Sequence, residues 1–192
     1  MDLVSYAIVS LDNVKSFIGI TNSQHDELLK FLINQATDYI ESYTGRRFVD
    51  TTYTEEKYDG NATQDLVLKQ FPVTATETFK LEKNNNFDNT DNWEEVDTDN
   101  YWVDNSEGCV HKISLFNLGK QNYRVTYSAG YDTVPFDLQF LACSLVGEIF
   151  NKRRAMGIKS EKLGDHSITF AGELAANESL QNIIGNYRKI PI

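Results

Sequence analysis

The residues that could bind a metal ion are few and widely spaced in this 192-residue chain. Cys109 and His111 are separated by one residue and could supply two zinc ligands, but a structural zinc site is commonly completed by a second such pair. No second pair stands at a suitable spacing, and Cys143, His25 and His166 belong to other predicted elements. We therefore interpret these side chains as structural or solvated, and we predict neither a metal nor a cofactor. Two distant cysteines also exclude a disulfide framework.

The acidic residues 88–99 invite a calcium interpretation, because Ca²⁺ is bound by many oxygen ligands. Trp93 occupies the sixth position of this run, where the loop of an EF-hand requires glycine. We therefore favour an exposed acidic hairpin tip at this position.

The patterns of common catalytic sites are missing from the sequence. It contains no phosphate-binding or dinucleotide-binding glycine motif, no His-Glu-x-x-His and no Gly-x-Ser-x-Gly. No pair of carboxylates can be assigned acid and base roles from spacing, which leaves an acidic-site hydrolase as the weakest hypothesis. We predict that the protein is not an enzyme.

The formal net charge of -10 is concentrated in the middle of the chain, where residues 50–110 hold 15 acidic residues and 4 lysines. This asymmetry indicates a separate module and disfavours a basic nucleic-acid surface on it. Aromatic residues in the module could stack sugars or bases, but at strand spacing most are expected to pack a thin sheet. They are Tyr53, Tyr58, Trp93, Tyr101, Trp102, Tyr123 and Tyr127.

The two ends of the chain have helical periodicity. A short helix is predicted from about residue 11 to 17, between a cap at Ser10 and a stop at Gly19, and a longer one from a cap at Ser23 to Gly45. Between residues 51 and 127 the period changes to two, which predicts antiparallel strands. The clearest are at residues 66–68, 78–81, 101–103, 110–115 and 123–127.

A third helix is predicted to begin at Pro135 and to end near residue 154, and a strand-like stretch at 167–170 precedes a last helix from about Glu178. The third helix is apolar around most of its circumference, so it needs two covering surfaces. One is its own helical core, and the other is the β module or a neighbouring subunit.

These patterns predict an α+β protein, a small helical bundle frame with an inserted, mostly antiparallel acidic β module. The N-terminal helices occupy residues 1–49, the module 50–131, the long helix 132–158 and a C-terminal segment 159–192. No apolar run approaches the ~20 residues of a membrane-spanning helix, and the N-terminus lacks the features of a signal peptide. We therefore expect a soluble protein with no membrane partner.

Several segments resemble, in the expected order, the head-tail connector (head-tail adaptor) proteins of tailed bacteriophages. The most specific are Tyr-Ser-Ala-Gly-Tyr at residues 127–131, followed shortly by proline, and Ser-Glu-Lys-Leu-Gly-Asp at 160–165. The middle of the chain is longer and more acidic than the minimal pattern of that family. The resembling segments are residues 9–20, 26–29, 36–46, 71–73, 123–131, 134–138, 159–168 and 183–188.

The resemblance implies a non-enzymatic ring of about twelve subunits in the virion neck, assembled in the host cytoplasm. The ring would dock beneath the portal protein, extend the DNA channel and offer a platform to the next neck or tail completion protein. An acidic lumen would let packaged DNA pass without tight binding. The alternative function is a module that binds carbohydrate or calcium.

Site residues are accordingly expected on surfaces. We expect subunit contacts at Phe136, Phe140 and Cys143, although these three could instead cover the β module. We expect portal docking at Ile183, Tyr187 and Arg188. The polar, glycine-containing start of segment 159–192 suggests that it is mobile in the free protein and orders on the portal.

Overall fold

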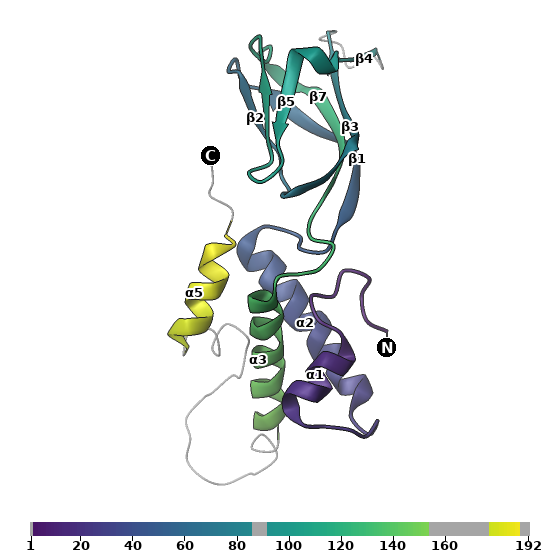
Figure 1. Ribbon diagram of the computed structural model, residues 1–192, viewed down its shortest axis with the longest axis vertical. Coiled ribbons are helices and arrows are strands. Elements are labelled where there is room, and N and C mark those ends of the chain that lie inside the picture. The colour runs from purple at the N-terminus through teal and green to yellow at the C-terminus, as the bar shows by residue number, and fades with distance from the viewer. Residues whose placement is uncertain (1, 86–91, 154–176, 189–192) are drawn as a thin grey trace. The chain divides into compact units, whose positions relative to one another are not determined.

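The computed structural model describes residues 2–85, 92–153 and 177–188, which are coloured in Figure 1. The chain divides into two compact units, one formed by Met1–Phe48 with Thr133–Ile192 and the other by Val49–Asp132. The first contains the helices and the second the strands, which confirms the predicted α+β class. The strand-like stretch at 167–170 and most of segment 159–192 lie outside the described residues.

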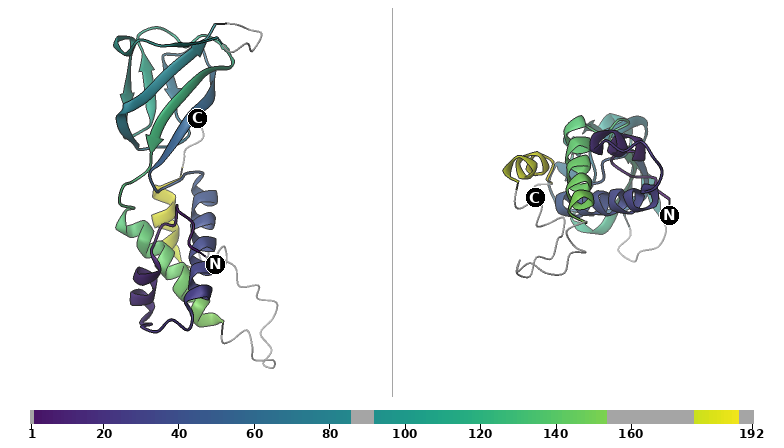
Figure 2. Two further views of the ribbon diagram at one scale, coloured as in Figure 1. Left: turned by 90° about the vertical axis from the view of Figure 1, so that its right-hand side faces the viewer. Right: turned by 90° about the horizontal axis from the view of Figure 1, so that it is seen from below.

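The helical unit is organised around its third helix. Helix α3 contacts each of the other three described helices and lies between α5 and the pair α1 and α2 (Figure 2, right). The bounds are α1 Leu11–Ile18, α2 Asp26–Thr44, α3 Phe136–Lys152 and α5 Glu178–Asn186. Within the described ranges, no helix combines the length and the apolar character needed to cross a membrane.

The ends of α1 follow from its flanking residues. The Ser10 hydroxyl accepts a hydrogen bond from the backbone N–H of Asn13 at 3.2 Å, as expected of an N-cap. Gly19 ends the helix in the left-handed conformation at φ 73°, which glycine adopts without steric cost. Gly45 ends α2 in the same way. These three predicted boundaries are confirmed.

The predicted start of α2 is wrong by about two residues. The helix begins at Asp26, and its N-cap position is His25, which makes no side-chain capping bond. A turn occupies the expected position: the Asn22 side chain accepts from the N–H of Gln24 at 3.1 Å, and the Ser23 carbonyl accepts from the N–H of Asp26 at 3.2 Å. Asparagine therefore organises this connection through a local turn that competes with a serine cap.

Most of the apolar surface of α3 is covered within the helical unit. Leu138, Leu141 and Leu145 are fully buried, and neighbouring apolar residues on other sides of the helix, including Cys143 and Val146, are buried as well. Helix α5 supplies one cover and helices α1 and α2 the other. Helix α5 is thus a cover that the sequence interpretation did not include, whereas contact of α3 with a neighbouring subunit stays a prediction.

The β unit consists of two antiparallel sheets whose apolar faces form one core. The four-stranded sheet has the order β1-β7-β3-β4 and the three-stranded sheet the order β2-β6-β5. Along β7, Tyr123, Val125 and Tyr127 are buried while the residues between them are half-buried, so the predicted period of two is confirmed there. The bounds are β1 Thr51–Gly60, β2 Asp65–Val67, β3 Val73–Asn84, β4 Trp93–Glu95, β5 Tyr101–Asp104, β6 Cys109–Lys112 and β7 Gly119–Ala129.

A buried polar network joins the strands to the segment that follows β2. The Tyr58 and Tyr127 hydroxyls both donate to the carboxylate of Glu56, the latter at 2.8 Å, and lie 3.1 Å apart. They accept from the backbone N–H groups of Lys69 at 3.1 Å and Gln70 at 3.3 Å. Burial raises the pKa of both tyrosines, so the two hydroxyls stay protonated and able to donate.

The chain enters and leaves the β unit at neighbouring points. Val49 and Tyr131 form a parallel bridge, and the N–H of Asp50 donates to the Tyr131 carbonyl at 3.2 Å. Gly130, the residue before Tyr131, has φ 129°, and a Cβ atom added to it would lie 2.7 Å from backbone atoms of Val49 and Asp50. Only glycine fits this crossing, because a side chain would clash with backbone and the conformation excludes other residues.

Gly130→Ala is expected to destabilise the β unit by more than about 2 kcal/mol, since it adds a backbone clash to an unfavourable conformation. Gly19→Ala is the matched control, because Gly19 also has a positive φ of 73° but no atom lies within 4 Å of its added Cβ. The control should cost only about 1 kcal/mol. Urea unfolding followed by circular dichroism measures both, and equal costs would contradict the close approach.

Glu41 is a buried carboxyl on α2. Its side chain is 11% exposed, its Oε2 lies 4.0 Å from Arg47 Nε, and its Oε1 has no hydrogen-bond partner among the described residues. Burial raises the pKa of this carboxyl to about 7, although the Arg47 charge and the Phe48 backbone act in the opposite direction. The folded chain therefore holds a proton on Glu41 at mildly acidic pH, where the unfolded chain has lost it.

This proton makes the stability of the helical unit depend on pH. Between the ordinary value of 4.5 and about 7 the folded state binds more protons than the unfolded state, so stability falls as pH rises across that window. Glu41→Gln should flatten this slope and stabilise the chain above the window by on the order of 1–3 kcal/mol. The free energy of unfolding in urea, measured for the wild type and for Glu41→Gln at a series of pH values, tests this prediction. A variant that keeps the wild-type slope would show that another group is responsible.

Candidate functional site

Three exposed phenylalanines lie together on helices α1 and α3. Phe136 is 83% exposed, and Phe140, one turn further along α3, is 49% exposed. The Phe140 ring meets the ring of Phe17 from α1 edge to face, with centroids 5.9 Å apart, and Phe17 is also 49% exposed. We call Phe17, Phe136 and Phe140 the aromatic surface. Large apolar side chains clustered in water are typical of surfaces that bind another macromolecule.

Cys143 does not belong to this surface. Its side chain is 5% exposed and packs inside the helical unit. Burial raises the pKa of the thiol to about 11, which keeps it protonated and weakly reactive. Phe136 and Phe140 are therefore the two expected contact residues that the structure places at the surface, and Phe17 is a neighbour that the sequence interpretation did not include.

The three residues expected to dock to the portal differ in their surroundings. Arg188 is exposed and Ile183 is half-buried on α5. The Tyr187 hydroxyl donates to the Asp137 carboxylate at 2.8 Å, and its ring packs edge to face on Phe48 with centroids 5.7 Å apart. Tyr187 thus fastens the end of α5 to the start of α3, so its main contacts are inside the helical unit.

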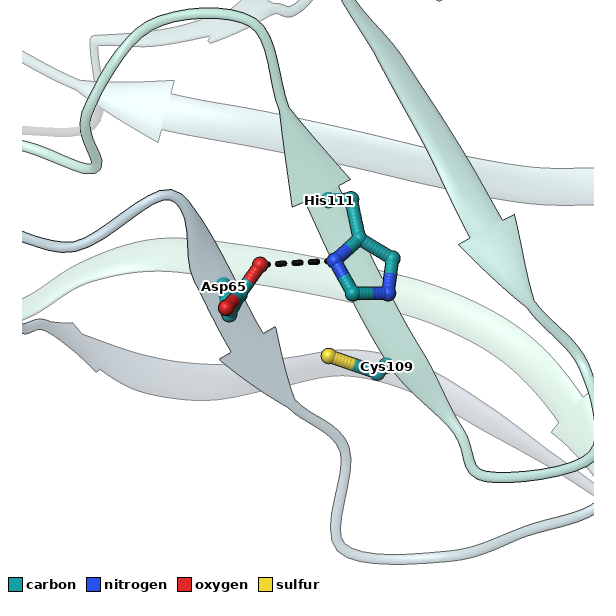
Figure 3. Close-up of side chains that lie close together, drawn as sticks. All are labelled: Asp65, Cys109 and His111. Carbon is teal, nitrogen blue, oxygen red and sulfur yellow. Dashed lines mark hydrogen bonds and ion pairs between the residues drawn. The ribbon is translucent and has the colours of Figure 1, made fainter.

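The described histidines have separate environments. His25 meets the Phe150 ring edge to face at 5.3 Å, which is a packing contact. His111 lies on β6, where its Nδ1 is 2.6 Å from Asp65 Oδ1 on β2, and the Cys109 thiol faces the same pair (Figure 3). The sequence interpretation paired Cys109 with His111 but missed Asp65, because only the register of β2 on β6 brings it there. His166 lies outside the described residues.

The whole chain has relatives in a known family. A family model described as head completion protein matches residues 7–190. The chain belongs to the head completion protein family. This membership confirms the resemblance to phage head-tail connector proteins. It identifies the chain as a member of a family of structural virion proteins.

Solved structures share the fold of this chain. The neck of an empty gene transfer agent (GTA) particle, computed with C6 symmetry, matches with a TM-score of 0.55 and 11% identity, over 100% of this chain and 96% of that chain. The neck of the native GTA particle, computed with C12 symmetry, matches with a TM-score of 0.53 and 12% identity, over 100% of this chain and 96% of that chain. The virion of the native GTA particle matches with a TM-score of 0.54 and 11% identity, over 100% of this chain and 95% of that chain. No curated protein sequence matches the chain significantly.

Some of the acidic side chains of the β unit form ion pairs on the outer face of its larger sheet. Glu82 of β3 is opposite Arg124 of β7, whose guanidinium donates to both carboxylate oxygens at 2.8 and 2.9 Å. Arg124 also contacts Glu55 at 3.0 Å and covers the Trp93 ring at 4.7 Å. The Arg124 guanidinium lowers the pKa of Glu82, and the Lys80 ammonium lowers it further, against the effect of burial. The Glu82 carboxylate therefore stays charged in its buried position.

The aromatic residues of the β unit are mostly core, as the strand spacing predicts. Tyr58, Tyr123 and Tyr127 are buried, and Tyr53 and Tyr101 pack against the same core. Trp102 differs, since it is 59% exposed and stacks on the His111 ring at 4.0 Å. The stacking surface that a carbohydrate-binding sheet would offer is therefore largely occupied by internal packing.

The exposed and buried positions of α3 should respond differently to truncation. Leu141→Ala removes a fully buried side chain and should cost about 2–5 kcal/mol of stability. Phe136→Ser should change the stability of the isolated chain by less than about 0.5 kcal/mol, since Phe136 is 83% exposed. Chemical unfolding of both variants tests the assignment. A large cost for Phe136→Ser would show that Phe136 is packed in the free chain.

Proposed function

We propose that the protein forms a homo-oligomeric ring in the neck of a phage-like virion, where it docks on the portal and carries the next neck or tail protein. The single observation that carries the proposal is full-length similarity. The family model covers residues 7–190, and two of the matching structures are necks computed with C6 and C12 symmetry. Both structural units of the chain therefore take part in the likeness.

The aromatic surface is the contact that we assign to a second copy of the chain. A cyclic ring needs a heterologous interface, in which one patch meets a different patch of the next subunit. Phe17, Phe136 and Phe140 supply large apolar groups without charge, and such aromatic side chains contribute strongly to protein interfaces. Their exposure in a single chain is explained if the neighbouring subunit buries them on assembly.

Helix α5 is the element that we assign to the portal. Asn177 caps the helix through hydrogen bonds from the N–H groups of Ser179 and Leu180, and Leu180 and Ile184 bury one face of it in the helical unit. Its other face is polar and exposed, and the exposed Arg188 follows two residues after the helix ends. Ile183 and Arg188 are the proposed contacts, and Tyr187 holds the helix in place through Asp137.

The acidic β unit suits a conduit that DNA passes without tight binding. A surface that binds duplex DNA carries Lys and Arg against the phosphates, whereas residues 50–110 hold 15 acidic residues and 4 lysines. Carboxylates near the channel would repel the backbone, so a packaged genome would slide.

Phe140→Asp tests the ring contact, because a charge placed in an apolar interface opposes association while an exposed site tolerates it. The variant should stay folded and lose the assembly, observed by native mass spectrometry and negative-stain electron microscopy at concentrations where the wild type forms rings. Phe31→Asp is the matched control, since Phe31 is 44% exposed on α2 and lies outside the aromatic surface. It should assemble like the wild type.

Two outcomes would contradict the assignment. If Phe140→Asp assembles into rings, the aromatic surface is not the subunit contact. If the wild type stays monomeric both alone and with a portal ring, the proposed assembly is wrong.

A further inference from the structure

Three potential metal ligands converge on one face of the smaller sheet. Cys109 and His111 are two residues apart on β6, so their side chains point to the same side. The register pairs Asp65 of β2 with His111, which places the carboxylate directly across the ladder. Asp65 Oδ1, His111 Nδ1 and Cys109 Sγ all lie within 4.8 Å of one another (Figure 3).

Neighbouring side chains hold this group in position. The Trp102 indole, from the adjacent strand β5, stacks on the His111 ring with centroids 4.0 Å apart and an angle of 21°. The stack fixes the plane of the imidazole, and the 2.6 Å contact with Asp65 directs Nδ1 toward the carboxylate. Orientation of a histidine by its surroundings lowers the cost of using it as a ligand.

Burial and charge are graded across the group. Cys109 is 8% exposed and forms the inner side, whereas the Asp65 side chain is 58% exposed and the His111 side chain 28%. The acidic residues Asp65, Glu107 and Asp104 lie close enough to the thiol to act on it electrostatically. The group is thus open to an ion from solvent on one side, and its local charge attracts a cation.

We propose that Asp65, Cys109 and His111 bind a divalent cation of the zinc class, with these three protein ligands and a fourth position open to water. The donor set decides the class of ion: a thiolate and an imidazole select Zn²⁺ and related metals over Mg²⁺ or Ca²⁺. This inference concerns the β unit alone and does not depend on the proposed ring.

The ligand atoms need only small shifts to accept the ion. Ligand atoms about 2.0–2.3 Å from a tetrahedral zinc lie about 3.5 Å from each other. The separations here run from 2.6 Å, between Asp65 Oδ1 and His111 Nδ1, to at most 4.8 Å. The closest pair must therefore move apart, and the exposed Asp65 carboxylate has room to do so. Binding requires loss of the Cys109 proton, so affinity should rise with pH.

The bound ion would join two strands whose ladder is short. Strand β2 has three residues, Asp65–Val67, and pairs with β6 through three residue pairs. Because a ligand that binds only the folded state stabilises it by mass action, zinc should raise the melting temperature of the chain.

Cobalt(II) titration of the reduced, tag-free chain is the decisive experiment, because thiolate coordination gives a charge-transfer band in the near ultraviolet and tetrahedral geometry gives visible bands. We expect one equivalent of cobalt(II) to saturate both the charge-transfer band and the visible bands, and we expect added zinc to displace the cobalt. Cys143→Ser, which removes the other thiol, is the matched control and should keep the bands. Cys109→Ser should abolish the charge-transfer band. Asp65→Asn and His111→Gln should each weaken binding by at least about tenfold.

Several results would overturn the proposal. These are a wild-type chain without the charge-transfer band, a band that survives Cys109→Ser but is lost in Cys143→Ser, and full affinity in both Asp65→Asn and His111→Gln. Cys109 is buried, so circular dichroism must show that its variant is folded. If the Cys109→Ser variant is not folded, the His111→Gln and Asp65→Asn variants, whose sites are more exposed, decide the outcome. Their melting temperatures should no longer rise with zinc as that of the wild type does.

Discussion

The structure depends on the crossing where the chain enters and leaves the β unit. Helices α2 and α3 belong to one helical unit, although residues 49–132 separate them in the sequence. An insertion of that length is compatible with their packing only if it returns the chain close to its starting point. The Val49–Tyr131 bridge and the close approach of Gly130 to Val49 and Asp50 provide this return. A single glycine in a Tyr-Ser-Ala-Gly-Tyr stretch thus permits two separate cores within one chain.

The sequence predicts the helices better than the details of the sheets. Ser10, Gly19 and Gly45 mark helix ends by local chemistry, and these ends are where the sequence places them. The start of α2 was misplaced because the Asn22 turn is a local alternative to a Ser23 cap. Strand β1 has an irregular register between Tyr53 and Glu56, where Glu55 has a positive φ, so its sequence shows no clean alternation.

The candidate sites show the same division between local and distant information. An excess of apolar residues on α3 was visible in the sequence, but not how much of it α5 would cover. What remains exposed, the aromatic surface, includes Phe17, which only packing of α1 on α3 brings beside Phe140. Likewise Asp65 lies far from His111 in the chain, and strand register alone joins them. Sequence spacing finds ligands within one strand, whereas cross-strand ligands require the ladder.

The discontinuity of the helical unit also determines the order in which the chain can fold during synthesis. Helices α1 and α2 leave the ribosome first, but α3, which they pack against, follows only after the whole β unit. Among the described residues, the strands of both sheets lie between residues 51 and 129, so the core of that unit can form before α3 is made. Domains generally fold as units as they emerge. We therefore expect the inserted unit to fold first, while the N-terminal helices remain without α3 until it is synthesised.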